Sequence, residues 1–285
     1  MNQANCPFQA FAAHRLQANI YDQSTIDYGA RERGILIHKA LQLFWKKHKT
    51  RNKLQNLISS NCLKSAIENI TKKAMKENSN LLEKQPYFTN MEKERTVRLL
   101  IEWMEQELLR SDFTVQYTEK NETIIINNLK LHLRIDRIDI TPENKTILID
   151  YKTGSINSNA WFINRIHDPQ LPLYSTKLSP NGIAFARISK GNIGWVSAYD
   201  QNISNPFFTK SNMNFPANIT EKTGLPHWDS LLNFWRNQLN ELAGEFIDGI
   251  LIIDPIKKSD TCRNCGYKML CRIGDSGYDD QTREY

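Results

Sequence analysis

The sequence predicts an α/β protein with a mixed, mainly antiparallel central sheet flanked by helices. The first observation is a change of hydrophobic period: apolar residues alternate with polar ones between 113 and 153, as in strands, and Asn- and Pro-containing turns separate the runs. The second is that helical spacing precedes this stretch and returns after it. Two further strand patterns, 183–188 and 194–199, complete the expected sheet.

The length and composition predict a single domain spanning residues 1–285. The chain is 40% hydrophobic and 24% charged, which suffices to bury one substantial core. No stretch approaches the roughly 18 apolar residues of a membrane span, and the first residues lack the apolar core of a secretory signal. We therefore expect a cytoplasmic protein without a membrane partner. A net charge of +6 and a pI near 9.0 mildly favour anionic partners such as nucleic acid.

Helical spacing predicts the elements ahead of the sheet. Pro7, in the favoured first-turn position, opens a helix expected over 7–20. In a second helix, expected over 31–48, one face is shared by Ile35, His38, Leu41, Gln42 and Trp45. Residues 52–110 are then interpreted as a helical insertion of two or three helices, broken at Pro86. We expect this insertion to pack on the core and to help guide a substrate.

Strand and helix patterns alternate through the rest of the chain. The expected antiparallel strands are 113–117, 123–126, 129–140 and 146–153. A short helix at 169–178 separates these strands from the pair at 183–188 and 194–199. The last predicted segments are an irregular loop at 201–225, an amphipathic helix at 227–246, a strand-like segment at 249–255 and a cysteine-rich region at 255–275.

The strongest chemical signal lies at the end of the 146–153 strand. Asp150 and Lys152 are two residues apart, so both side chains point to the same face of that strand. The preceding strand carries Asp136, and a hairpin through 142–145 would place the two strands side by side. The two carboxylates would then lie close enough to share a hard cation such as Mg²⁺ or Mn²⁺.

This combination suits phosphodiester hydrolysis. The metal would neutralise charge on the phosphate and lower the pKa of the attacking water, and a nearby lysine could hold or deprotonate that water. The alternative is structural, because each acid taken alone is more often an ion-pair partner or a solvated residue than a catalytic group. Two acids on adjacent strands favour the catalytic interpretation.

Four motifs, in order, resemble those of the RecB-like branch of the PD-(D/E)XK nuclease superfamily. They are Gly34-x-x-x-His38 on a helix, Asp136-Arg137-Ile138-Asp139 on a strand, Asp150-Tyr151-Lys152-Thr153-Gly154 at a strand end and Gln170-x-x-x-Tyr174 on a helix. The resemblance covers most of the chain and implies a restriction-endonuclease-like core. One departure is Leu133, where the family often has glycine three residues before the first aspartate. That departure removes no ligand.

The resemblance also implies roles for these residues. By it, the Mg²⁺ or Mn²⁺ ligands are His38, Asp136, Asp150 and the Tyr151 carbonyl. Lys152 would assist the nucleophilic water. Gln170 and Tyr174, one helical turn apart, would contact DNA or brace Lys152, and a helix-packing role is the alternative. His38 taken alone would be interpreted as a core histidine, but the two aspartates reverse that interpretation.

Four of the five cysteines form a second constellation. Cys262, Cys265 and Cys271 are close in sequence, and Cys6 could supply a fourth thiolate if the two ends of the chain meet. Such a set could hold a [4Fe-4S] cluster or a zinc ion. The placement is similar to that in the B subunits of AddAB-type helicase-nucleases and in CRISPR-associated iron-sulfur exonucleases. This resemblance implies a structural iron-sulfur cluster rather than zinc. The fifth cysteine, Cys62, is expected to be a small buried apolar residue.

Together these features predict a metal-dependent DNA nuclease, and in particular an exonuclease that acts on single strands or duplex ends in repair or recombination. A non-catalytic DNA-binding or scaffold module is one alternative, and a hydrolase acting on RNA or another phosphorylated substrate is another. The chain carries no Gly-x-x-x-x-Gly-Lys-Ser/Thr phosphate loop. A helicase or motor partner, supplied by another domain or subunit, is therefore expected from the resemblance.

Overall fold

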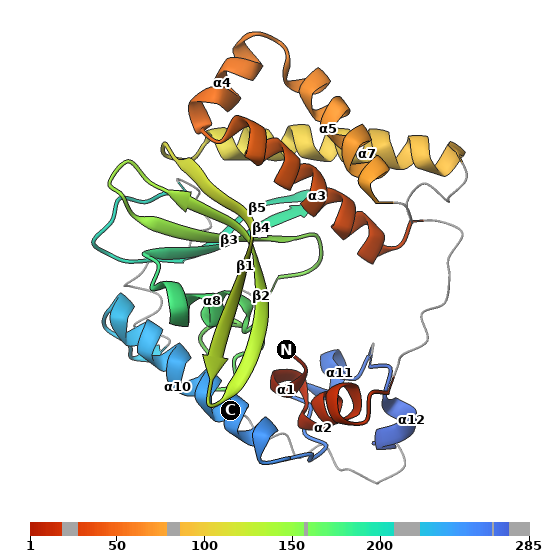
Figure 1. The fold of residues 1–285 in the computed structure, drawn as a ribbon, viewed down its shortest axis with the longest axis vertical. Coiled ribbons are helices and arrows are strands. Elements are labelled where there is room, and N and C mark those ends of the chain that lie inside the picture. The colour runs from red at the N-terminus through yellow and green to blue at the C-terminus, as the bar shows by residue number, and fades with distance from the viewer. Residues whose placement is uncertain (19–27, 79–85, 157–158, 208–222, 264, 274–285) are drawn as a thin grey trace.

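The structure, a computed structural model, describes residues 1–18, 28–78, 86–156, 159–207, 223–263 and 265–273. Its centre is a five-stranded sheet with the order β1-β2-β3-β4-β5. Helices lie on both faces of this sheet, and a third group of short helices gathers both ends of the chain to one side (Figure 1). The predicted α/β class with a mixed, mainly antiparallel sheet is confirmed.

The sheet combines an antiparallel meander with one parallel pairing. Its strands are β1 (Thr114–Ile126), β2 (Leu129–Ile140), β3 (Thr146–Lys152), β4 (Gly182–Ser189) and β5 (Asn192–Tyr199). The first three run antiparallel in sequence order, β4 runs parallel to β3, and β5 returns antiparallel to β4. The crossover between β3 and β4 contains the helix α8 (Gln170–Leu178), as a parallel connection requires.

The stretch predicted as two strands, 113–117 and 123–126, is one continuous strand. The Lys120-Asn121 pair, expected to form a turn, instead pairs with β2. The strand tolerates polar residues here because β1 lies at the edge of the sheet. Its irregularity appears in other ways: a shift of register early in the strand, and a positive φ of 53° at Glu119.

One face of the sheet is covered by four described helices. These are α3 (Ala30–His48), α4 (Arg51–Ser59), α5 (Leu63–Glu77) and α7 (Pro86–Leu108), all on the same side of the sheet in Figure 1. The 52–110 region is therefore helical, and its last helix begins at the predicted break, Pro86. Among the described residues, no helix of the protein is both long enough and apolar enough to cross a bilayer.

The face of α3 that contains His38 is only partly buried. Leu41 and Trp45 are buried, but Ile35 is 45% exposed, and His38 and Gln42 are intermediate. The core is contacted by a neighbouring stripe of side chains: Leu36, Ile37, Ala40, Leu41, Phe44 and Trp45. The face with His38 is therefore turned toward the carboxylates described below.

The opposite face of the sheet is covered by α8 and α10 (Trp228–Ile247), which match the predicted helices. Tryptophans fix this layer through their ring N–H groups: Trp235 donates to the Trp161 carbonyl at 2.8 Å, and Trp228 donates to the Pro180 carbonyl at 2.7 Å. Of the predicted 201–225 loop, residues 208–222 lie outside the described residues. Phe207, just before them, is fully buried in the core.

The described N-terminal segment and the short helices that follow α10 lie together beside α10 (Figure 1). The elements there are α1 (Asn2–Asn5), α2 (Pro7–Ala10), the π-helical turn η1 (Phe11–Arg15), α11 (Lys258–Thr261) and α12 (Lys268–Cys271). The predicted 7–20 helix is thus shorter than expected, and its last two residues lie outside the described part. The strand-like 249–255 segment forms no described strand; instead the Phe8 N–H donates to the Ile252 carbonyl at 3.2 Å.

A fully buried ion network ties β2 to the end of α7. The Arg137 guanidinium lies 2.6 Å from Glu107 and 2.6 Å from Asp139, and Arg110 contacts the same two carboxylates at 3.0 and 2.8 Å. Two positive and two negative groups therefore compensate one another inside the core. The Arg137 guanidinium also stacks 4.1 Å from the centroid of the Trp45 ring, which joins the network to α3.

Replacing Arg137 by methionine should destabilise the protein by about 3–5 kcal/mol, because Glu107 and Asp139 would be left as buried carboxylates sharing one arginine. Urea unfolding followed by tryptophan fluorescence measures this loss. Arg98→Met, at an exposed position of α7, is the matched control and should change the stability by less than about 0.5 kcal/mol. Equal effects of the two substitutions would contradict a structural role of the network.

Candidate active site

The register of β2 and β3 places two aspartates opposite each other. Arg137 pairs with Ile149, so continuing the antiparallel register by one residue sets Asp136 opposite Asp150. Asp136 Oδ2 also accepts a hydrogen bond of 2.9 Å from the backbone N–H of Tyr151. Both carboxylates are almost fully buried, with 5% and 1% exposure. The predicted hairpin therefore brings the two acids together as expected.

His38 approaches this pair from α3. Its Nε2 lies 2.9 Å from the Tyr151 carbonyl oxygen, and its Nδ1 lies 3.3 Å from Asp136 Oδ2. One turn earlier, Gly34 permits the close approach of the helix, because an added Cβ would lie 3.3 Å from Thr153 Oγ1. The Gly-x-x-x-His spacing thus brings the helix against the end of β3 and points the imidazole at the aspartates.

Lys152 is held by three partners. Its Nζ lies 3.0 Å from Asp150 Oδ2 and 3.4 Å from Asp168 Oδ2, and it donates to Gln170 Oε1 at 3.2 Å. The amide of Gln170 then donates to the hydroxyl of Tyr174 at 2.9 Å. The Gln170–Tyr174 pair on α8 therefore contacts the lysine directly, as the bracing interpretation of these two residues expected.

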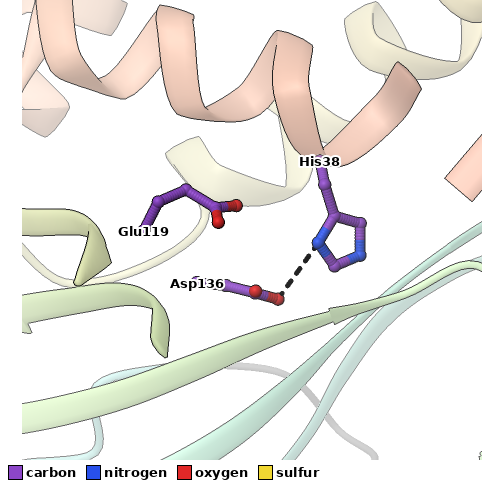
Figure 2. A group of neighbouring side chains, drawn as sticks. All are labelled: His38, Glu119 and Asp136. Carbon is purple, nitrogen blue, oxygen red and sulfur yellow. Dashed lines mark ion pairs between the residues drawn. The ribbon is translucent and has the colours of Figure 1, made fainter. Parts of the chain in front are cut away.

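Two acidic residues of this site belong to no sequence motif, and their place in the site was not predicted from the sequence. Glu119, on β1, forms with His38 and Asp136 a trio whose ligand atoms all lie within 4.8 Å of one another. Figure 2 shows the three side chains converging, with the carboxylates of Glu119 and Asp136 on one side and the imidazole of His38 on the other. Asp168, ahead of α8, is the second. The positive φ of Glu119 is a strained conformation for a residue of this type, and such strain concentrates at functional sites.

Burial dominates the electrostatics of Asp150. It raises the pKa of this carboxyl from 3.8 to about 7; the Asp136 carboxylate adds to the rise, and Lys152 opposes it. Although Lys152 is near, Asp150 Oδ2 accepts no well-aligned hydrogen bond from the described residues. This buried oxygen can still accept an interaction, and it lies next to a second carboxylate. A cation bound there would stabilise both negative charges.

The carboxylates of the site favour the charged forms of His38 and Lys152. Burial lowers the pKa of His38, but hydrogen bonding to Asp136 and the charges of Asp136, Asp150 and Glu119 outweigh burial and raise it. Both ring nitrogens face oxygen acceptors, as an imidazolium requires. Burial likewise lowers the pKa of Lys152, and the carboxylates of Asp150 and Asp168 more than reverse that effect.

The donor set fits a hard divalent cation. The carboxylates of Glu119 and Asp136 and one nitrogen of His38 lie within 4.8 Å of one another. The Tyr151 carbonyl contacts His38, and the Asp150 carboxylate lies near enough to Asp136 for their charges to interact. Oxygen-rich sets of this kind suit Mg²⁺ and Mn²⁺ better than the thiolate- and imidazole-rich sets of zinc sites. A bound cation would use the Asp150 oxygen that accepts no aligned hydrogen bond, and it would lower the pKa of His38, which the nearby carboxylates raise.

The four predicted cysteines are neighbours in space. Burial raises the pKa of Cys262, and the thiols of Cys265, Cys6 and Cys271 raise it further, in that order. Cys6, near the N-terminus, therefore lies close to the three cysteines that follow α10. Cys62 corrects an expectation, because it is exposed rather than buried. It stands just ahead of α5, in the turn that follows α4, and this turn leaves its side chain in solvent.

A family model for the PD-(D/E)XK nuclease superfamily matches residues 2–272. The chain belongs to this nuclease superfamily, which accounts for the sheet and for the acid-rich end of β3.

Proteins similar in sequence to this chain support its assignment to the RecB-like branch. The chain is 23% identical, over 98% of its length, to a protein of Clostridium perfringens strain SM101 that is named as a subunit of an ATP-dependent helicase/deoxyribonuclease, and equally to the same-named protein of two further strains. It spans 30% of the length of these relatives. A solved structure titled "Crystal structure of SSO0001" aligns with 93% of the chain at 14% identity and a TM-score of 0.34.

Metal binding by this site should strengthen as the pH rises. Without metal, Asp150 binds a proton up to a pH of about 7 in the folded state but only up to about 3.8 when unfolded, so folding stability falls as the pH rises between these values. The raised pKa of His38 acts in the same direction, because its stabilising charge is lost at higher pH. The increase in melting temperature caused by Mg²⁺ or Mn²⁺ should therefore be larger at about pH 8 than at about pH 6.

Thermal melts of chelated and metal-loaded protein at the two pH values test this. Asp150→Asn should raise the melting temperature of the metal-free protein at the higher pH and abolish most of the metal effect, since it removes the buried charge. The same metal-induced shift at both pH values, or an Asp150→Asn variant that responds to metal like the wild type, would contradict the assignment.

Proposed function

We propose that this protein is a Mg²⁺- or Mn²⁺-dependent DNA nuclease, and specifically an exonuclease acting in DNA repair or recombination. The observation that carries the proposal is the arrangement at the end of β3. His38, Glu119 and Asp136 bring their ligand atoms within 4.8 Å of one another, and Lys152 is paired with Asp150 on the adjacent strand β3. Membership of the nuclease superfamily supports the reaction class, and the words "helicase/deoxyribonuclease" in the relatives' name support DNA as the substrate.

The acids and the histidine would hold the cation. When bound, the metal supplies charge neutralisation on the scissile phosphate and lowers the pKa of the attacking water. Glu119, Asp136 and Asp150 are proposed as its carboxylate ligands, with the Tyr151 carbonyl and His38 completing the set. Because Asp136 and the Tyr151 peptide are already hydrogen-bonded to each other, the ligand atoms are positioned before the metal arrives.

Lys152 is proposed to orient the water rather than to act first as a base. Its ammonium group is stabilised by Asp150 and Asp168, so its charged form dominates at neutral pH. A charged lysine can donate a hydrogen bond to the attacking oxygen or to a phosphate oxygen, and it stabilises the negative charge that develops there. Gln170 fixes the direction of the ammonium group, and Tyr174 fixes Gln170 by donating to the Arg134 carbonyl at 2.6 Å.

A motor partner is also proposed. The chain spans 30% of relatives that are named as parts of an ATP-dependent helicase. The present sequence lacks the phosphate loop that a motor of the usual kind needs. We infer that DNA unwinding, where it accompanies cleavage, is supplied by a partner domain or subunit. Copurification with a helicase would support this, and ATP-driven unwinding by the isolated chain would exclude it.

Cleavage of labelled linear DNA tests the nuclease. Asp150→Ala and Lys152→Ala should each lower the cleavage rate at least about 100-fold with Mg²⁺ or Mn²⁺, and chelator should abolish it. Glu119→Ala should lower the rate and raise the metal concentration that gives half-maximal cleavage. Lys72→Ala, at an exposed position of α5, removes a lysine away from the site and should retain the wild-type rate.

The release of mononucleotides from DNA ends, against internal nicking of circular DNA, would separate an exonuclease from an endonuclease. DNA binding without metal-dependent cleavage, in protein that carries all its cysteine-bound iron, would instead support the non-catalytic scaffold. Faster cleavage of RNA than of DNA would contradict the proposed substrate.

For the four cysteines we propose a structural [4Fe-4S] cluster. The support is that Cys6 lies near enough to Cys262, Cys265 and Cys271 for their thiols to interact electrostatically, and four cysteine thiolates can hold such a cluster. The cluster would fasten the two ends of the chain together, adding to the Phe8–Ile252 and Ile256–Asn5 backbone hydrogen bonds.

This region also contacts the segment whose residues hold Lys152. Arg165 donates to Asp254 Oδ2 at 2.9 Å on the C-terminal side and to the Gln3 carbonyl at 3.3 Å on the N-terminal side. Asp168 and Gln170, which hold Lys152, follow Arg165 by three and five residues. Fastening the ends of the chain therefore supports the position of the lysine as well as the fold.

Cys6→Ser should remove most of the iron and the visible absorbance of anaerobically purified protein, and lower its melting temperature by at least about 5 °C. Cys62→Ser, at the exposed cysteine, is the control and should leave all three measurements unchanged. Stoichiometric zinc in place of iron in the wild type would exclude the cluster, and so would iron that survives Cys6→Ser.

A further inference from the structure

A polar groove of about 560 Å³ opens directly beside the metal site. α3 forms one wall with Ile35, His38, Lys39 and Gln42; the end of α5 contributes Glu77, and the β1–β2 pair contributes Glu119, Asn121 and Arg134. His38 and Glu119 belong both to this groove and to the trio of possible metal ligands. Whatever occupies the groove therefore lies next to the reacting phosphate.

The charges of the groove are already compensated. Lys39 Nζ lies 2.9 Å from Glu77 Oε2, and Arg134 Nε lies 2.5 Å from Glu119 Oε2. A track for the phosphate backbone would present unpaired lysines and arginines, because phosphate binding rests on net positive charge. The groove is close to neutral, so its chemistry favours a polar but uncharged part of the substrate.

Besides these paired charged groups, the groove is lined by side-chain amides. The side chains of Gln42 and Asn121 make no hydrogen bond to the described residues, and both line the groove. Each amide offers a donor pair and an acceptor, the combination that matches the edge of a nucleobase. Ile35, 45% exposed on the same wall, offers an apolar surface against which the face of a base can pack.

We propose that this groove binds one unstacked nucleobase of single-stranded DNA, next to the scissile phosphate. The inference rests on the proposed nuclease function and narrows its substrate class. In a duplex the Watson–Crick edge of each base is already paired and the faces are stacked, so a base can enter such a groove only from a single strand or a frayed end. The base would anchor the strand while His38 and Glu119 face its phosphate.

Binding of a fluorescein-labelled thymidine oligonucleotide, measured by anisotropy with chelator present to prevent cleavage, tests the groove directly. The double variant Gln42→Ala/Asn121→Ala should bind the single strand about five- to tenfold more weakly than the wild type. Gln55→Ala/Asn69→Ala removes two exposed amides from α4 and α5, away from the groove, and should bind within about twofold of the wild type. Equal melting temperatures of the two double variants would establish that both are folded.

An abasic position moved along the oligonucleotide identifies the base itself. When the abasic position occupies the groove, the wild type should bind about five- to tenfold more weakly, as the double variant does with the intact oligonucleotide. The Gln42→Ala/Asn121→Ala variant should bind the intact and the abasic oligonucleotide equally. Insensitivity of the wild type at every position would overturn the subsite, as would equal cleavage of single strands and of duplexes with sealed ends. Base-dependent binding without any cleavage would instead overturn the nuclease proposal while leaving the subsite standing.

Discussion

The backbone of Tyr151 is the junction on which the site depends. Its N–H donates to Asp136 of β2, and its carbonyl accepts from His38 of α3. These hydrogen bonds join two strands and a helix at the point where Asp150 and Lys152 flank the same residue. Because the Tyr151 ring is buried in the core below, the backbone cannot shift without disturbing the packing. The positions of the acids are thus fixed by main-chain geometry rather than by mobile side chains.

Because side chains alternate along β2, its buried ion pairs lie on one face of the sheet and Asp136 lies on the other. Asp136 faces the site, whereas its neighbour Arg137 faces the opposite side and is compensated by Glu107 and Asp139. The same short stretch therefore holds a closed ion network in the core and an open set of acids at its end. Burial raises the pKa of Asp150 to about 7, with a further contribution from Asp136, because Lys152, which Asp150 shares with Asp168, offsets these effects only in part. An incompletely compensated acid of this kind is suited to binding a cation.

Residues within one element were predictable from spacing, whereas residues that join the site from elsewhere were not. The two-residue interval of Asp150 and Lys152 and the four-residue interval of Gln170 and Tyr174 each fix a common face. Glu119 had no such signal, since a single acid in a polar strand resembles a solvated residue. The same limit explains the error at Cys62, whose exposure depends on which elements pack near it and not on its local pattern.

The sequence by itself determined the order of helices and strands, the superfamily motifs and the set of cysteines able to share one centre. Hydrophobic period and residue spacing carry this information locally. Only the tertiary structure decided that β1 is continuous, that Glu119 joins His38 and Asp136, and that a groove with paired charges adjoins these three side chains. The physical reason is that these features arise from contacts between segments far apart in the chain. Such contacts are set by how the sheet and helices pack together, which no local pattern records.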